Sequence, residues 1–273
     1  LKNTPKMIDA ILAEKKVVKK WVKDHDLRGI ISDNRLGVVS KKVPSVFITH
    51  QLNVLTGNTS WLTGKLHRQI IRKFTECWIP DSDALVNLSG KLGHLEDSDL
   101  DLRYIGPLSR FEPKTIPIKY DLMVILSGPE PQRGMLEKQL TEELERYEGK
   151  VLFIKGVMEK EQRKSSIGNV DFYNFMTSSD LEKAFNESKV VLSRSGYTTV
   201  MDLAKLQKKA FFIPTPGQYE QEYLAKKLKK DGLVPYAKQE NFRIENLLEI
   251  DLYKGLPKIE HPIHWKKLFC LFE

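Results

Sequence analysis

The chain has 273 residues, of which 41% are hydrophobic and 29% are charged, a balance typical of folded globular proteins rather than disordered ones. It contains no apolar run long enough to cross a bilayer, no secretory signal pattern, and only two cysteines, too few for a disulfide framework or a metal knuckle. The net charge of +8 fits solvated helix faces, an anionic membrane surface or a phosphorylated substrate, and no nucleic-acid-binding module is recognisable.

The first part of the chain alternates between helical and strand patterns. Helical apolar spacing occurs at residues 8–22 and 61–74, and short buried strands are predicted at residues 29–31, 43–49, 77–79 and 103–105. The helix at 61–74 is basic and begins with Trp61, so it either lies on a membrane surface or packs against the sheet. Because the chain starts in a helix that leads to an internal strand, we expect that its natural N-terminal portion is missing.

A linker is predicted at residues 108–119, which contain Pro113 and Pro117 and show no regular period. Alternation then resumes, with strands predicted at 121–127, 151–154, 170–175, 190–192 and 210–213, and helices at 135–147, at 179–186, at the end of the stretch 193–204, and at 219–230. Ser179 and Glu182 form a capping-box pattern at the start of one helix. We expect an α/β chain with parallel-sheet domains at 1–108 and 109–256, and a C-terminal helix at 257–273 that docks on the first domain.

The stretch from Ser193 to Ala204 is the most informative part of the sequence. A strand leads into a Ser/Gly turn and then a helix, so unpaired backbone N–H groups and the positive end of the helix dipole can bind a phosphate. Asp202, four residues after Thr198, could accept hydrogen bonds from a ribose diol, or could be a solvated helical acid. With the polar pair Gln221 and Glu222 after the next strand, the pattern predicts a nucleotide-sugar pocket.

This part of the sequence resembles the MurG-like glycosyltransferases of family 28. The resemblance covers about residues 105–234 and depends on the Arg-Ser-Gly-x-x-Thr-Val-x-acid pattern at Arg194 to Asp202 and the x-Gln-x-Tyr cluster at Glu220 to Tyr223. It implies a GT-B-like fold, in which two Rossmann-like parallel-sheet domains face each other across a cleft. The domain at 1–108 would take the acceptor and the domain at 109–256 the donor, a UDP-sugar, with no cofactor and no metal.

The resemblance also implies roles for individual residues. Asp202 stands where the family has a ribose-binding glutamate, and Gln221 with Glu222 stands where it has two glutamines on the donor sugar; Glu222 departs from that pattern. The helix start that contacts the diphosphate corresponds to Arg194, Ser195, Gly196, Thr198 and Thr199. Arg194 is alternatively a structural donor to nearby carbonyl groups.

Three further positions complete the implied donor site. Ser127, Gly128 and Gln132 match a glycine-rich turn, which here is rich in proline and so has fewer N–H donors. Arg110 aligns with a linker arginine near the donor phosphates. Phe175 and Met176 stand where backbone groups would contact the edge of the uracil ring.

The reaction implied is a single inverting displacement by an acceptor hydroxyl, which needs a general base. His50, at the end of the predicted strand 43–49, is the first candidate, with a structural or acceptor-binding role as the alternative; His94 is the second. Two Asp-x-Asp patterns, at residues 81–83 and 97–99, could bind a metal, but such aspartates more often form turns and caps.

The predicted function is transfer of a sugar similar to N-acetylglucosamine from a UDP-sugar to a glycan or lipid-linked acceptor of the cell envelope. We expect a cytoplasmic protein, either free or peripheral on the inner face of the plasma membrane, with no nucleic-acid partner. Two alternatives remain open: a nucleotide-sugar-binding subunit without a complete catalytic site, and a UDP-sugar epimerase on the same fold.

Overall fold

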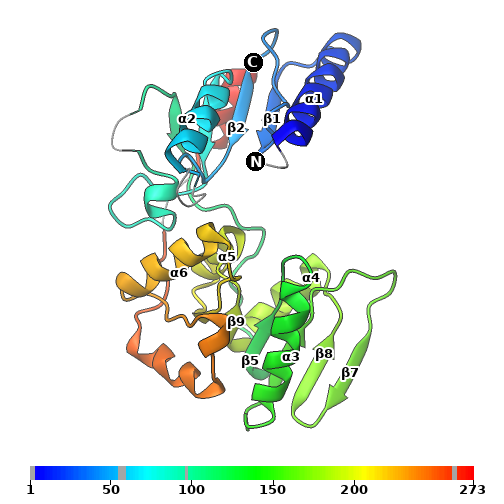
Figure 1. The fold of residues 1–273 in the computed structure, drawn as a ribbon, viewed down its shortest axis with the longest axis vertical. Helices are drawn as coiled ribbons and strands as arrows, with labels where there is room; N and C mark the ends of the chain where they lie inside the picture. The colour runs from blue at the N-terminus through cyan, green and yellow to red at the C-terminus, as the bar shows by residue number, and fades with distance from the viewer. Residues whose placement is uncertain (1–3, 55–59, 96–97, 260–262) are drawn as a thin grey trace. The chain divides into compact units, whose positions relative to one another are not determined.

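The computed structural model describes residues 4–54, 60–95, 98–259 and 263–273. It divides into two compact units, the first formed by the chain up to Pro107 together with the segment 260–273, and the second by residues 108–259. Figure 1 shows helices and strands alternating along both units. Among the described residues, no helix combines the length and the apolar character that a membrane span requires.

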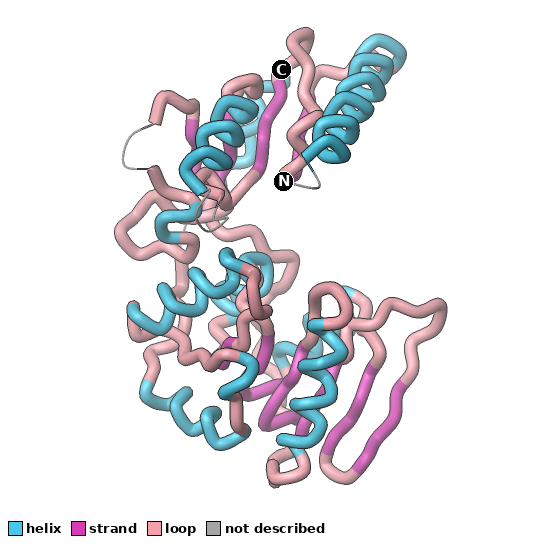
Figure 2. Tube along the Cα trace, viewed as in Figure 1, coloured by secondary structure: helices cyan, strands magenta, loops and turns pink. Residues whose placement is uncertain are grey.

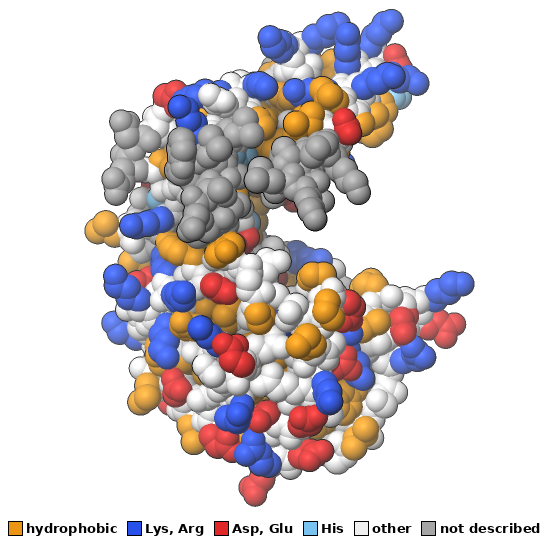
Figure 3. Space-filling model, viewed as in Figure 1, with side chains coloured by type: hydrophobic (Ala, Val, Ile, Leu, Met, Phe, Trp, Pro, Cys, Tyr) orange, Lys and Arg blue, Asp and Glu red, His pale blue; other side chains and the backbone are white. Residues whose placement is uncertain are grey.

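The first unit contains a sheet of four parallel strands in the order β1-β2-β3-β4. Its elements are α1 (Thr4–Asp24), β1 (Ile30–Asp33), β2 (Ser45–Ile48), α2 (Ser60–Ile71), β3 (Glu76–Ile79), the 3-10 turn η2 (Gly90–Leu92), β4 (Leu102–Tyr104), α7 (Trp265–Phe269) and η5 (Cys270–Phe272). Phe47, Ile71 and Ile79 belong to a buried cluster between α2 and the sheet. Figure 3 shows Lys and Arg side chains gathered over α1, which carries five lysines after Glu14.

The C-terminal segment packs on the first unit through aromatic side chains. The rings of Phe269 and Phe272 lie 6.0 and 6.3 Å from the ring of Trp78, which is itself buried in β3. A Cβ atom at Gly29 would lie 2.0 Å from the Phe272 ring, so the absence of a side chain at position 29 permits this packing.

The second unit contains a six-stranded sheet in the order β10-β9-β5-β6-β8-β7, parallel except for the β7–β8 pair. Its elements are β5 (Tyr120–Ile125), α3 (Gln132–Leu144), β6 (Val151–Ile154), β7 (Lys164–Ile167), β8 (Val170–Tyr173), α4 (Ser178–Asn186), β9 (Ser188–Ser193), α5 (Tyr197–Leu206), β10 (Lys209–Phe212), α6 (Tyr219–Lys230), and the 3-10 segments η3 (Gln239–Asn241) and η4 (Ile244–Leu252). Apolar side chains of β5, β6 and α3, including Leu122, Phe153 and Leu140, form its core.

Three local features differ from the sequence-based prediction. Strand β7 was not predicted, because all four of its residues are exposed and carry no apolar alternation; Figure 2 shows it beside β8 at the edge of the sheet. Helix α3 begins at Gln132 rather than Met135. Helix α4 is capped by Thr177 rather than Ser179, because the carboxylate of Glu182 instead accepts the backbone N–H of Glu112.

Candidate functional site

The candidate site lies at the carboxyl edge of the second sheet, where β5 and β9 are neighbours. The chain leaves β5 through α3 to reach β6 on one side, and leaves β9 through α5 to reach β10 on the other. In open parallel sheets, ligands bind outside the strand ends at the point where successive connections diverge in this way. The turns after β5, β9 and β10 carry most of the predicted donor-site residues, and all three lie at this edge.

The start of α5 is not capped by the protein. Gly196, at the N-cap position, has extended backbone angles (φ −68°, ψ 142°) and forms no side-chain cap, and a Cβ atom there would meet no other atom within 4 Å. The backbone N–H groups of Thr198 and Thr199 have no hydrogen-bond partner among the described residues, and the Thr198 side chain is exposed. The positive end of α5 is therefore open to an anion.

Arg194 is buried beneath this turn, with 2% of its surface exposed. Its guanidinium group donates to the carbonyl oxygens of Ile213, Pro214 and Gln132 at 3.0–3.1 Å and to Oε1 of Gln239 at 2.9 Å. Its Nε has no partner, and burial lowers the pKa of Arg194 to about 10. These contacts match the structural alternative: Arg194 joins the turns of the site and places a buried positive charge below them.

Asp202 is buried in α5 rather than solvated. Its Oδ1 accepts a hydrogen bond of 2.6 Å from the hydroxyl of Ser109, which belongs to the segment predicted as a linker. Burial raises the pKa of Asp202, while the Ser109 hydrogen bond and the charge of Arg110 oppose that rise. Oδ2 accepts no hydrogen bond from the described residues and is the atom through which Asp202 could hold a ribose hydroxyl.

Gln221 and Glu222 fold back onto the turn after β10. Oε1 of Gln221 accepts the backbone N–H of Thr215 at 2.9 Å, and Oε1 of Glu222 accepts that of Gly217 at 3.0 Å. The hydroxyl of Ser195 donates to the backbone carbonyl of Gln221 at 2.8 Å. This hydrogen bond joins the turn after β9 directly to the start of α6, the helix that follows β10. A cavity of about 140 Å³ opens beside this turn, with Glu222 and Gln239 in its wall.

The remaining donor-site candidates lie along the same strand edge. Ser127 and Gly128 are exposed after β5, and Gly128 has a φ of +101°, which favours glycine. Gln132 is the first residue of α3. Phe175 and Met176 follow β8, two strands from β5, and the backbone N–H and C=O of Phe175 already bond to Asn174 and Gln162. Arg110 is exposed, with its guanidinium 5.0 Å from the centre of the Phe111 ring.

The histidine candidates belong to the first unit. His50 is half-buried just after the carboxyl end of β2. His94 is engaged by the backbone on both sides: its Nδ1 lies 2.9 Å from the carbonyl oxygen of Gly90 and its Nε2 lies 2.8 Å from that of Ser82. His94 therefore closes the loop between β3 and β4, which makes it a poor candidate for a base.

Two aspartates of the Asp-x-Asp patterns, Asp81 and Asp99, have structural partners, whereas Asp83 is exposed. The carboxylate of Asp81 is fully buried and accepts the backbone N–H groups of Ser82, Leu88 and Ser89. Asp99 forms a two-point ion pair with Arg72, and Asp97 lies outside the described residues. Within the described ranges, no three His, Cys, Asp or Glu side chains gather as a metal site would require.

Sequence reasoning missed three residues that shape this edge. Ser109 contacts Asp202, Gln239 contacts Arg194, and Glu130 contacts the start of α3. Ser109 and Gln239 lie 93 and 45 residues from their partners, so no local pattern in the sequence could reveal them. Glu130 lies inside the proline-rich turn. Its position four residues before Gly134 is the sequence feature that could have indicated its contact with the start of α3.

Comparison with known proteins agrees with this geometry. Residues 133–264 match the family model of the glycosyltransferase family 28 C-terminal domain. A Haemophilus ducreyi protein named UDP-N-acetylglucosamine–N-acetylmuramyl-(pentapeptide) pyrophosphoryl-undecaprenol N-acetylglucosamine transferase is 24% identical over 253 residues, which cover 89% of this chain and 68% of that protein. The chain thus spans about two thirds of the length of this relative.

Solved structures show the same architecture. MurG of Acinetobacter baumannii aligns with a TM-score of 0.54 and 15% identity, covering 90% of this chain and 75% of that one. Arabidopsis thaliana UGT89C1, complexed with UDP-L-rhamnose, aligns with a TM-score of 0.62 and 12% identity, covering 100% of this chain and 78% of that one. At such identities these likenesses concern the fold.

Proposed function

We propose that this chain is a MurG-like member of glycosyltransferase family 28 with the GT-B fold and that it transfers a sugar from a UDP-sugar to a hydroxyl acceptor. The single observation that supports this best is the uncapped start of α5 at the switch point of the second sheet. The leaving group of the reaction is a diphosphate, and a helix N-terminus with open amides stabilises the charge that develops on it.

We assign each part of the donor to a different group of the described residues. The amides of Thr198 and Thr199 bind the diphosphate, above the buried charge of Arg194. Asp202 binds the ribose through Oδ2, while Ser109 fixes its orientation. Gln221 presents its amide NH₂ to the sugar, because its Oε1 is held by Thr215.

The finer parts of the proposal are the donor sugar, the acceptor and the stereochemistry. The names of the relatives support N-acetylglucosamine as the sugar and a lipid-linked acceptor, which would place the enzyme at a membrane surface. We propose a single inverting displacement with His50 as base and without a metal, because the helix start and its amides supply the positive charge that the leaving group needs.

Substitution of Gly196 tests the donor site directly. Its backbone angles suit any residue and a Cβ atom meets no neighbour, so Gly196→Ala and Gly196→Val should fold normally while filling the space of the phosphate. We expect UDP to raise the melting temperature of the wild type, less so for Gly196→Ala, and hardly at all for Gly196→Val. Ser179→Val, at the exposed start of α4, is the matched control and should respond like the wild type.

Turnover separates the proposed function from its alternatives. Incubation with radiolabelled UDP-N-acetylglucosamine and a lipid-linked acceptor should yield labelled acceptor. Isomerised sugar without acceptor would instead identify an epimerase, and binding without turnover a nucleotide-sugar-binding subunit. A UDP response that persists fully in Gly196→Val would show that the diphosphate binds elsewhere.

A further inference from the structure

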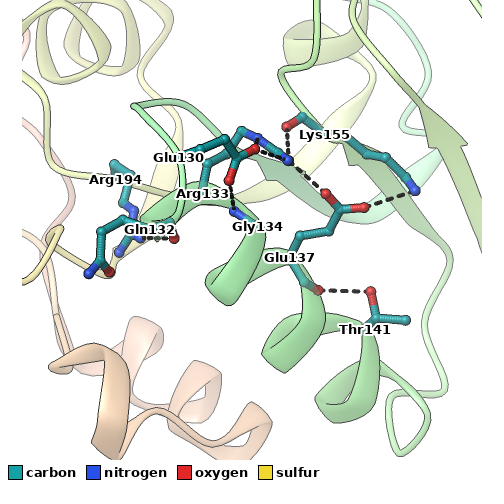
Figure 4. Close-up of polar contacts among 8 residues, drawn as sticks. All are labelled: Glu130, Gln132, Arg133, Gly134, Glu137, Thr141, Lys155 and Arg194. Carbon is teal, nitrogen blue, oxygen red and sulfur yellow. Dashed lines mark hydrogen bonds and ion pairs between the residues drawn. The ribbon is translucent and has the colours of Figure 1, made fainter.

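The second helix start at the switch point, that of α3, is already occupied by a carboxylate of the chain. Oε2 of Glu130 accepts the backbone N–H of Gly134 at 3.0 Å (Figure 4). The N–H groups of Arg133 and Met135 donate to the carbonyl oxygens of Pro129 and Pro131. A carboxylate at this position stabilises a helix as a bound anion would. The proline residues on either side of Glu130 remove two further N–H groups from the turn.

Glu130 is held in this position by a network of charges. Its Oε1 accepts from Nε of Arg133 at 2.7 Å, Nη1 of Arg133 donates to Glu137 at 2.6 Å, and Glu137 pairs with Lys155 at 2.9 Å. A Cβ atom at position 134 would lie 2.9 Å from Oε2 of Glu130, so a side chain there would displace the carboxylate from its present position. The charges of the two glutamates, Arg133 and Lys155 sum to zero, so the turn presents no net positive charge to an incoming phosphate. The backbone N–H groups of residues 133–135 are already hydrogen-bonded and cannot bind the phosphate either.

The two helix starts of the switch point therefore differ: α5 is open and α3 is filled. They lie close together, because Arg194, in the turn before α5, donates to the carbonyl oxygen of Gln132 in the first turn of α3 at 3.1 Å. We propose that Glu130 is a specificity-determining residue that confines the diphosphate to α5 and disfavours ligands with an additional phosphate. This inference rests on the proposed function and defines its substrate class.

The chemical consequence is selection between nucleotides. In a nucleoside diphosphate sugar the second phosphate ends in a neutral sugar, whereas a nucleoside triphosphate must place a further charged group beyond it. The other helix start within reach is α3, where that group meets the carboxylate of Glu130. Like charges repel, and because the Glu130 side chain is exposed, solvent and dissolved salt weaken this repulsion.

The test is the affinity of UDP and UTP for three proteins, measured by calorimetry without divalent metal. Glu130→Gln removes the charge and keeps an oxygen for the Gly134 amide. Glu142→Gln removes the same charge from the exposed far end of the same helix and is the control. For one unit charge about 10 Å from the phosphates at low salt, Coulomb's law predicts about eightfold tighter UTP binding and about fivefold tighter UDP binding in Glu130→Gln, because UTP carries one more negative charge, with little change in Glu142→Gln.

A smaller gain at high salt would support the electrostatic origin further. Equal changes for UDP and UTP, or the same gain in Glu142→Gln, would overturn the role of Glu130 while leaving the donor site at α5 standing. Weaker binding of both nucleotides in Glu130→Gln would show that Glu130 only maintains the turn, which also overturns the proposal. A wild type that binds neither nucleotide overturns the proposed function and this inference together.

Discussion

Replacing His67 with leucine should remove a pH-dependent loss of stability from the first unit. His67 lies on α2 with its ring 5.9 Å from that of Phe47, and its Nδ1 is buried without a hydrogen-bond partner. Burial, and secondarily the neighbouring Arg68, lower the pKa of His67 to about 4. The folded protein therefore binds the proton less readily than the unfolded chain, whose histidine has a pKa of about 6.5.

The direction and the size of the change in stability with pH follow from this difference in the pKa of His67. Protonation favours the unfolded chain, so the stability is highest above about pH 6.5 and falls as the pH drops toward about 4. A shift of about 2.5 units is equivalent to about 3 kcal/mol in full, of which about 2 kcal/mol is lost by about pH 5. His67→Leu should lack this loss, and the removal of an unpaired buried nitrogen adds to its stability at low pH.

Tryptophan fluorescence isolates the relevant unit. All four tryptophans, Trp21, Trp61, Trp78 and Trp265, belong to the first unit, so urea unfolding followed by their emission reports that unit alone. The stability difference between His67→Leu and the wild type should grow by about 2 kcal/mol between about pH 7 and pH 5. His25→Gln, at the exposed end of α1, should keep the pH dependence of the wild type. A constant difference for His67→Leu across this range would refute the reasoning.

Two further changes test the interior of each unit. Arg194→Met should lower the stability of the second unit by about 2–4 kcal/mol in urea unfolding followed by circular dichroism, because three carbonyl oxygens and Oε1 of Gln239 lose the guanidinium donor. Unchanged stability would show that these contacts are dispensable. Asp81→Ala should lower the stability of the first unit by about 3–5 kcal/mol in the fluorescence assay, since the buried N–H groups of Ser82, Leu88 and Ser89 lose their acceptor; a loss below about 1 kcal/mol would contradict this.

Most of the fold could be predicted because parallel strands buried on both faces leave a clear apolar signal. Runs such as residues 121–125 and 151–154 are nearly continuous in apolar residues, and the first is followed by a helical pattern. Strand β7 has no such signal, since it pairs with β8 through its backbone while its side chains remain in solvent. Its existence depends on the neighbouring strand and not on its own residues.

The candidate site could be placed by sequence but not described in detail. The turn at 193–196 and the polar pair at 221–222 indicated which strand ends matter. The sequence could not show that Arg194 is turned inward, because its acceptors are backbone carbonyl groups from two separate segments and a side-chain oxygen from a third. The same limit applies to Glu130, whose effect depends on the conformation of the turn around it.

The return of residues 263–273 to the first unit has a consequence for biosynthesis. The second unit is one uninterrupted stretch of chain, whereas the aromatic side chains that cover Trp78 and Gly29 arrive some 160 residues after the rest of their unit. During synthesis all of the second unit is made before Phe269 and Phe272, so the first unit keeps Trp78 uncovered until the end of the chain is released. A released chain truncated just before Phe269 should therefore hold a protease-resistant second unit beside a sensitive first one.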